Sequence, residues 1–225
     1  MRVLALETST RRGSAALLEG SRVLATAEHE ELNAHAERML GLVEGLLERC
    51  GWSRASIERV AVGTGPGSFV GLRVGIALAQ GLALGLDVPV VGVSSLRAMA
   101  GAVPDARREP RLALLDARRN EVFAAAYAAD GRELLAPRAV ARASAAELVR
   151  ELGAPIVVGA VAAELALDAE LLRGTELDLP HAQFVGLLSE SLRPEEFPAV
   201  PQYCRSAGAT LPDLPPSPFS IRSGN

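Results

Sequence analysis

The glycine-rich stretch from Gly65 to Gly75, with the sequence GPGSFVGLRVG, is the segment whose composition could bind a phosphate group. It follows an apolar, strand-like run and opens a helix-length segment that continues to residue 85. A phosphate-cradling P-loop needs a lysine near its end, and this chain contains no lysine. A dinucleotide-binding fingerprint needs a third glycine where Ser68 stands. The loop therefore excludes a Walker-type nucleotide site and matches a dinucleotide site only weakly.

Histidine and cysteine, the side chains that most often bind transition metals, are few and scattered. The histidines are His29, His35 and His181, and the cysteines are Cys50 and Cys204. Two distant cysteines form neither a disulfide framework nor a zinc motif. No histidine pair has the spacing that places two ligands on one face of a helix. We therefore expect no metal site and no cofactor.

A stripe of small residues runs along the helix that the glycine-rich loop opens. Gly67, Gly71 and Gly75 recur at every fourth residue, and Ala79 and Ala83 continue the spacing, so all five share one helix face. A glycine inside a helix costs up to about 1 kcal/mol relative to alanine. The stripe therefore predicts the close approach of another backbone, which is either the domain's own sheet or a partner protein. A Gly75→Leu variant distinguishes these alternatives by its stability and its binding.

The composition limits the classes of protein to consider. Of the 225 residues 49% are apolar, so the chain can bury a real core. Aromatic residues make up 4% and the net charge is −4, which is unlike a protein that binds nucleic acid on its own. Arg73 and Gln80 interrupt the glycine-rich helix, so we do not expect it to span a membrane. No secretory signal precedes the first strand, and we expect a cytoplasmic protein.

The expected secondary structure repeats itself in two halves. A pattern of three strands, a helix and a further strand occurs in residues 1–105 and again in residues 106–205, and residues 206–225 form a tail expected to be disordered. We expect strands over 3–6, 13–18, 22–27, 57–62, 88–93, 111–115, 121–127, 132–140 and 155–158. We expect helices over 34–50 with Asn33 as its N-cap, from the glycine-rich loop to 85, and over 95–102, 144–152, 162–172 and 181–192. The repeat predicts two α/β halves that meet at a cleft.

Two halves with this strand order resemble the duplicated actin-like ATPase fold, an α/β fold of the ASKHA and RNase H-like type. Five motifs carry a resemblance to the TsaB (YeaZ) family, which covers roughly residues 2–205. They are LALETST at 4–10, GPGSFVGLRVG at 65–75, GVSSL at 92–96, DAR at 116–118 with EVF at 121–123, and PQYCR at 201–205.

The resemblance implies a non-catalytic subunit of the bacterial machinery that makes threonylcarbamoyladenosine at position 37 of tRNA. Such a subunit dimerises with the similar catalytic subunit, TsaD, and an ATPase subunit, TsaE, joins the pair. For the chain alone, a homodimer is left as an alternative. We expect tRNA to bind only through the complex. The catalytic relative holds its metal with a His-x-x-x-His pair, whose matching positions here are Ser95 and Met99. A hydroxyl and a thioether are poor ligands for such metals, so we expect an inactive paralogue without catalytic residues.

The resemblance also points to two groups of candidate residues. Glu7, Thr8 and Ser9 occupy the first hairpin turn, where actin-like proteins grip phosphate, and we regard them as a possible vestigial phosphate loop or as braces of the turn. The helix 34–50 and the glycine-striped helix are expected to pack against their counterparts in TsaD as a small helix bundle. The residues that we assign to this partner surface are His35, Met39, Val43, Gly71, Leu72, Gly75, Ile76 and Ala79.

Two other functions remain as alternatives. An autonomous actin-like ATPase or sugar kinase would need a glycine in the phosphate turn of both halves, and Asp116-Ala117-Arg118 supplies none. A metallopeptidase of the glycoprotease type would need the His-x-x-x-His pair that Ser95 and Met99 replace. Metal analysis together with an ATPase assay separates the three hypotheses.

Overall fold

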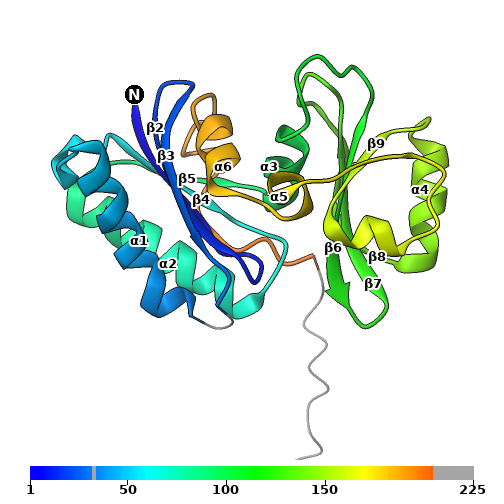
Figure 1. The fold of residues 1–225 in the computed structure, drawn as a ribbon, viewed down its shortest axis with the longest axis horizontal. Helices are drawn as coiled ribbons and strands as arrows, with labels where there is room; N and C mark the ends of the chain where they lie inside the picture. The colour runs from blue at the N-terminus through cyan, green and yellow to red at the C-terminus, as the bar shows by residue number, and fades with distance from the viewer. Residues whose placement is uncertain (32–33, 205–225) are drawn as a thin grey trace, which may run out of the picture.

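The computed structural model describes residues 1–31 and 34–204, which form two β-sheets that lie side by side (Figure 1). The strands of the first sheet are β1 (Arg2–Glu7), β2 (Gly13–Glu19), β3 (Arg22–His29), β4 (Arg59–Gly63) and β5 (Val90–Val93). Their order is β3-β2-β1-β4-β5. The first three strands form an antiparallel meander, and β4 and β5 continue the sheet parallel to β1.

The second sheet repeats the first. Its strands are β6 (Arg111–Arg118), β7 (Glu121–Tyr127), β8 (Glu133–Ala141), β9 (Ile156–Val158) and β10 (Glu170–Leu172). Their order is β10-β9-β6-β7-β8, with an antiparallel meander and two parallel strands as before. Two sheets with the same order and directions confirm the expected duplicated α/β fold.

Helices cover both faces of each sheet (Figure 1). They are α1 (His35–Cys50), α2 (Phe69–Leu86), α3 (Ser95–Gly101), α4 (Ala145–Glu151), α5 (Thr175–Asp178) and α6 (Ala182–Ser189), with 3₁₀ turns η1 (Arg54–Ser56), η2 (Arg142–Ser144) and η3 (Ala160–Glu164). Alternate residues of β1 point to opposite layers: Leu4 and Leu6 pack with α1 and α2, whereas Val3 and Ala5 pack with α6. The helix α3 lies between the sheets and packs on β6 and β7.

The helix expected over residues 162–172 is wrong. Alanine and leucine in this segment favour a helix by propensity, but η3 ends at Glu164 and Glu170 to Leu172 pair with β9 as a fifth, parallel strand. This pairing provides hydrogen-bond partners for the backbone groups at the edge of β9. It is a tertiary effect that local propensity does not report. The expected N-cap Asn33, Arg205 and the tail lie outside the described residues.

After the second sheet the chain returns to the first. The helix α6 packs on β1 and β2, Gly92 N–H donates to Phe197 O (2.8 Å), and Gln202 N–H donates to Thr64 O (2.8 Å). Residues 182–202 therefore contact the first half, although the sequence pattern assigns them to the second. The division near residue 105 stays a prediction.

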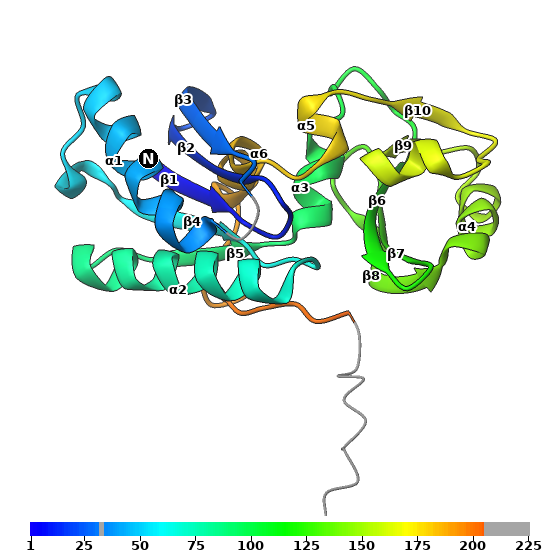
Figure 2. The same cartoon turned by 60° about the horizontal axis from the view of Figure 1, so that its bottom comes forward.

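The helix α2 is more apolar than its packing requires. Within the described residues it is the one helix that is long and apolar enough to cross a membrane, with a mean hydropathy of 1.7 and 33% of its residues buried. Core helices pass the same test, and α2 packs along β4 with Ala79 and Ala83 in the core. Figure 2 shows α2 at the outer edge of the molecule beside α1. Much of its apolar surface therefore faces outward.

Candidate functional site

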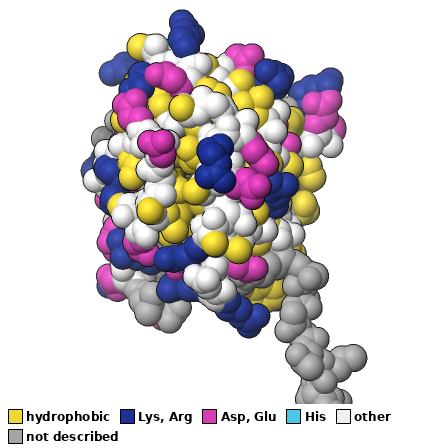
Figure 3. Space-filling view, turned by 90° about the vertical axis from the view of Figure 1, so that its right-hand side faces the viewer, with side chains coloured by type: hydrophobic (Ala, Val, Ile, Leu, Met, Phe, Trp, Pro, Cys, Tyr) yellow, Lys and Arg dark blue, Asp and Glu magenta, His cyan; other side chains and the backbone are white. Residues whose placement is uncertain are grey.

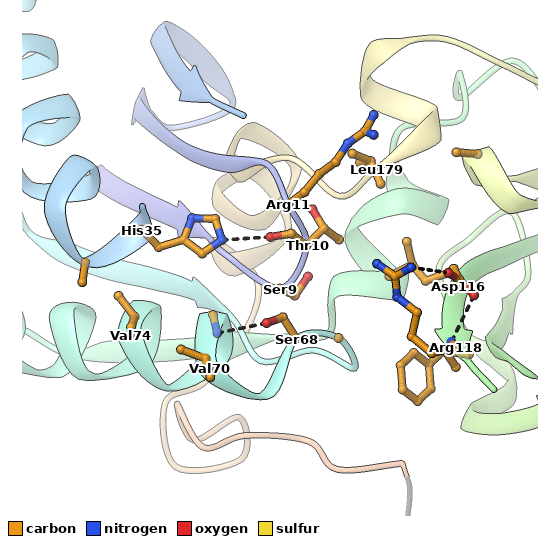
Figure 4. A pocket seen from close by; sticks show the side chains of 17 residues that line it. Ser9, Thr10, Arg11, His35, Ser68, Val70, Val74, Asp116, Arg118 and Leu179 are labelled. Carbon is orange, nitrogen blue, oxygen red and sulfur yellow. Dashed lines mark hydrogen bonds and ion pairs between the residues drawn. The ribbon is translucent and has the colours of Figure 1, made fainter. Parts of the chain in front are cut away.

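The cleft between the two halves has a volume of about 540 Å³ (Figure 4). On one side lie the β1–β2 turn and the start of α2, which contribute Ser9, Thr10 and Ser68. On the other side lie residues at the end of β6, including Asp116 and Arg118. The expected meeting of two α/β halves at a cleft is thus present, and both hairpin turns face it.

The glycine stripe lets α2 lie directly against the β1–β2 turn. A Cβ atom added to Gly67 would lie 2.1 Å from Ser9 O, one added to Gly71 would lie 2.2 Å from Thr8 O, and one added to Gly75 would lie 2.0 Å from Thr8 Oγ1. Thr8 Oγ1 donates to Gly71 O (2.8 Å). The backbone that approaches the stripe therefore belongs to this chain.

The hydrogen-bonding groups of Glu7, Thr8 and Ser9 are mostly used inside the protein. Ser9 N–H donates to Glu7 Oε1 (2.6 Å), and Ser9 O accepts from Ser68 N–H (2.7 Å). The Ser9 hydroxyl is buried without a hydrogen-bond partner among the described residues, and Ser9 lines the cleft. This geometry supports the bracing role, and phosphate binding by the turn stays untested.

Glu7 is fully buried and connects three segments. Ser95 Oγ, at the start of α3, donates to Glu7 Oε2 (2.7 Å), and Gly65 N–H donates to Ser95 Oγ (3.1 Å). Burial raises the pKa of Glu7, although the hydrogen bonds from Ser9 and Ser95 act against the shift. Ser95, one of the two residues expected from the sequence to replace metal ligands, therefore holds a carboxyl group in place, and Met99, the other, is buried in the core around β6.

Glu7→Gln is expected to increase stability relative to the wild type as the pH rises. The folded-state pKa of Glu7 lies above the unfolded value of 4.5, so its stabilising contribution is complete below pH 4.5 and is lost as the pH rises through the folded pKa. Glutamine keeps the acceptor for Ser9, replaces the acceptor for the Ser95 hydroxyl by an NH2 donor at every pH, and does not ionise. Urea unfolding of both proteins from pH 4 to 8 measures the difference, and a difference that shrinks with pH would contradict the assignment.

The second wall of the cleft is a turn with an unusual backbone. Arg118, Arg119 and Asn120 all have left-handed φ angles, of 63°, 51° and 61°, a region that residues other than glycine adopt rarely. Asp116 Oδ1 accepts from Arg118 N–H (3.0 Å) and from Arg142 Nη2 (3.2 Å). These contacts hold the turn although it contains no glycine.

His35 lies at the start of α1 and contacts the β1–β2 turn, which forms one side of the cleft. Its Nε2 donates to Thr10 O (2.9 Å), and its Nδ1 lies 3.2 Å from His29 Nε2. The position before the helix is Ala34, which has no side chain to cap it. The histidine pair therefore connects α1 to the end of β3 and to the β1–β2 turn.

The side chains assigned to a partner surface lie within the packing of this chain. All eight assigned residues are buried in the chain's own interior, because the apolar stripe of α1 and the glycine stripe of α2 face the first sheet. They are His35, Met39, Val43, Gly71, Leu72, Gly75, Ile76 and Ala79. The outward side of α2 instead exposes Leu84 (85%) and Val70 (66%), and Val70 also lines the cleft. Whether these helices bind a partner stays a prediction.

Sequence reasoning missed Arg12, the largest fully buried side chain among residues 1–31 and 34–204. It leaves the β1–β2 turn and donates to Thr175 O (2.6 Å) and Leu179 O (2.6 Å). Both acceptors lie on the segment that connects the second sheet to α6. Arg12 follows the equally basic Arg11, and no local pattern distinguishes the buried arginine from the exposed one.

The two sheets with one topology and the cleft between them define a protein of the actin-like, RNase H-like class. The activator of 2-hydroxyisocaproyl-CoA dehydratase from Clostridium difficile shares this fold, with a TM-score of 0.54 at 13% identity over 84% of this chain and 94% of that chain. The family model for TsaD, tRNA N6-adenosine threonylcarbamoyltransferase, matches residues 24–206.

Nearer relatives identify the family. The structure of YeaZ from Pseudomonas aeruginosa has a TM-score of 0.74 at 30% identity and covers 90% of this chain and 99% of that chain. The protein TsaB of Escherichia coli is 44% identical over 133 residues, and that of Haemophilus influenzae is 41% identical over 125. These alignments cover 58% and 54% of this chain, and 56% and 51% of the two relatives, about half of their length. The chain belongs to the TsaB (YeaZ) family.

Proposed function

We propose that this chain acts in the biosynthesis of threonylcarbamoyladenosine in tRNA, as a non-catalytic subunit that binds and activates TsaD. The curated relatives carry the name "tRNA threonylcarbamoyladenosine biosynthesis protein TsaB". The family model that matches residues 24–206 describes the transferase TsaD. The chain and the transferase therefore share a fold, and TsaE and a homodimer of the free chain belong to the same proposal as further contacts.

The observation that carries the proposal is the outward face of α2. Val70 and Leu84 are 66% and 85% exposed, and Cβ atoms added to Gly81 and Gly85 would meet nothing within 4 Å. Leu40 of the neighbouring α1 is 45% exposed. Small residues beside exposed leucines let a second helix pack closely, and burial of such side chains stabilises an association by about 1.5–3 kcal/mol each.

The shared fold indicates what covers this face. TsaD matches the same family model, so its equivalent helices would present an equivalent face. Two related layers of two helices then pack together around a pseudo-twofold axis, as isologous interfaces do. The outward side chains of α1 and α2 form this surface in place of the buried ones assigned from the sequence.

The remaining surface favours an indirect role in tRNA recognition. Figure 3 shows the face of the second half, on which basic and acidic side chains alternate. The net charge of the chain is −4. A protein that binds nucleic acid by itself concentrates positive charge on one face, so the tRNA would bind through the assembled complex.

The proposal is tested with Val70→Glu and Leu84→Glu, each assayed for co-elution with TsaD from the same organism. A charge in the interface should weaken binding at least 100-fold, while these exposed sites should change the stability by only about 0.5 kcal/mol. Leu134→Glu is the matched control, because Leu134 is exposed (38%) on β8, in the other half. Binding of both variants at the wild-type level would contradict the proposed interface.

The non-catalytic role has its own measurement. The chain alone should transfer no threonylcarbamoyl group to tRNA, and addition of the chain should increase transfer by TsaD. Transfer by the chain alone, or ATP hydrolysis that is lost in a Ser9→Ala variant, would favour an autonomous enzyme instead.

A further inference from the structure

Two histidines bond directly to each other where α1 meets the first sheet. His29 ends β3 and His35 begins α1, and His35 Nδ1 lies 3.2 Å from His29 Nε2. The rings meet edge to face, with their centroids 5.0 Å apart. Gly13 of β2 permits this contact, because a Cβ added there would lie 2.7 Å from His35 Nδ1 and closer still to His29 Nε2. The pair therefore joins β3 to the start of α1 at a point where β2 has no side chain.

The neighbours of the two rings determine where the protons lie in the neutral pair. Thr10 O can only accept, so His35 Nε2 carries a proton and donates to it (2.9 Å) (Figure 4). The Nδ1 of a neutral His35 is then unprotonated and accepts from His29 Nε2–H. His29 Nδ1 is left as an acceptor, buried and without a hydrogen-bond partner in the described part of the chain. The contact between the rings thus requires a proton on only one of the two facing nitrogens.

The paired rings can hold one additional proton but not two. With one, His35 can donate to His29 Nε2 after the His29 proton moves to Nδ1. With two, both nitrogens of the 3.2 Å contact carry a proton, and both rings carry a positive charge. His35 is 7% exposed, so water cannot separate the rings in place. The conflict is removed only if the start of α1 moves away from β3 and from the β1–β2 turn.

The charges around the pair do not compensate for a second proton. The charged side chains that surround it in the described residues are Arg11, Glu30, Glu31 and Arg38. They are ion-paired with one another, at 3.9 Å beside the β1–β2 turn and at 2.8 Å at the start of α1. The helix α2 presents Gly71, which has no charge, to His35. Burial, and then the charge of His35, lowers the pKa of His29.

We propose that the His29–His35 pair is an acid-sensitive clasp, which holds the start of α1 on the β1–β2 turn at neutral pH and releases it when both rings are protonated. Thr10 and His35 line the cleft, so the release changes one wall of the cleft. Released rings bind protons at the ordinary histidine value of 6.5. The released state is therefore favoured progressively as the pH falls below 6.5. The clasp lies within the free chain, so it is tested independently of TsaD.

The experiment follows the imidazole signals of the full chain by NMR from pH 8 to 4.5, together with hydrogen exchange of the Arg38 amide. This amide donates to Ala34 O (2.9 Å) and so reports the first turn of α1. The signals of His29 and His35 should shift together, with the second proton binding at pH 5 or below. Protection of the Arg38 amide, corrected for the intrinsic exchange rate, should fall at least tenfold between pH 7.5 and 5, because released rings bind both protons at pH 5 and the paired rings do not.

Two variants separate the clasp from other effects of acid. In His29→Gln the amide can either donate to His35 Nδ1 or accept from it, so protection at Arg38 should change less than twofold over the same range. His181→Asn is the control, because His181 is also buried and its pKa is also lowered by burial. Asparagine keeps an acceptor at the N-cap of α6, where His181 Nδ1 accepts from Gln183 N–H (3.2 Å). This variant should keep the tenfold fall at Arg38.

The wild-type titration does not depend on the folding of either variant. A coupled titration, with a fall in protection that His29→Gln removes and His181→Asn retains, supports the clasp. The proposal is overturned if His29 and His35 titrate independently near pH 6.5 or if protection at Arg38 does not fall in the wild type. It is equally overturned if His29→Gln shows the full fall or if His181→Asn abolishes it.

Discussion

Gly71→Ala is expected to lower the free energy of unfolding by about 3 kcal/mol, the upper end of the usual cost of overpacking a core. The added Cβ would lie 2.2 Å from Thr8 O and 3.3 Å from His35 Cδ2. Thr8 O is a backbone atom of the buried β1–β2 turn and cannot rotate away. The start of α2 must therefore move off the turn, which also stretches the bond from Thr8 Oγ1 to Gly71 O (2.8 Å).

The same helix provides the matched control. A Cβ added to Gly81 would meet nothing within 4 Å, so Gly81→Ala should increase stability by about 0.5–1 kcal/mol through helix propensity alone. Urea unfolding of the two variants and the wild type measures both effects. Equal stability of Gly71→Ala and Gly81→Ala would show that the β1–β2 turn does not contact the stripe.

The same contrast predicts the result of Gly75→Leu, the variant that distinguishes packing of the stripe within the chain from packing against a partner. Gly75 faces Thr8 Oγ1 at 2.0 Å from its added Cβ, so leucine there should destabilise the chain while the folded fraction still binds TsaD. Val70→Glu should do the opposite and leave a folded chain that no longer binds. The two faces of α2 thus have different roles: the glycine side packs on the sheet, and the outward side is the surface that we propose for the partner.

The succession of strands along the chain, apart from β10, could be predicted because it depends on local signals. Apolar runs separated by polar turns mark β1 and β2 and again β6 and β7, and both halves have the same sheet order. The spacing of Gly67, Gly71 and Gly75 likewise predicted close approach of a backbone. Periodicity does not tell which backbone approaches, since a core face and an interface use the same small residues. The structure places Thr8 and Ser9 against the stripe.

Long-range contacts explain the remaining differences between the predicted and the observed structure. The segment Glu170 to Leu172 is helical by composition, but it becomes a strand because β9 offers it a parallel edge. Arg12 likewise binds the carbonyl groups of Thr175 and Leu179, which only the folded chain brings near it. No pattern within a window of ten or twenty residues reports contacts of this kind.

Arg12→Met is expected to lower the free energy of unfolding by about 3–5 kcal/mol, because it leaves three backbone carbonyls without their donor, at about 1–3 kcal/mol each. Arg12 is 1% exposed and donates to Thr175 O (2.6 Å), Leu179 O (2.6 Å) and Pro180 O (3.3 Å). Methionine fills much of the space but leaves these carbonyls without donors. The substitution also removes the positive charge of Arg12, which lies 3.7 Å from the Glu28 carboxylate.

The destabilisation caused by Arg12→Met should be largest in the segments through which Arg12 connects the two halves. Its acceptors precede α6, so hydrogen exchange of α6 amides should accelerate more than that of β6 amides in the Arg12→Met variant. Arg12→Lys should be intermediate, because one ammonium cannot reproduce the two-pronged contact of a guanidinium. The neighbouring Arg11 is the control, since it is 65% exposed and lies 3.9 Å from Glu30, and Arg11→Met should cost less than about 1 kcal/mol. If Arg11→Met and Arg12→Met unfold at the same urea concentration, Arg12 does not hold the crossing segment to the first sheet.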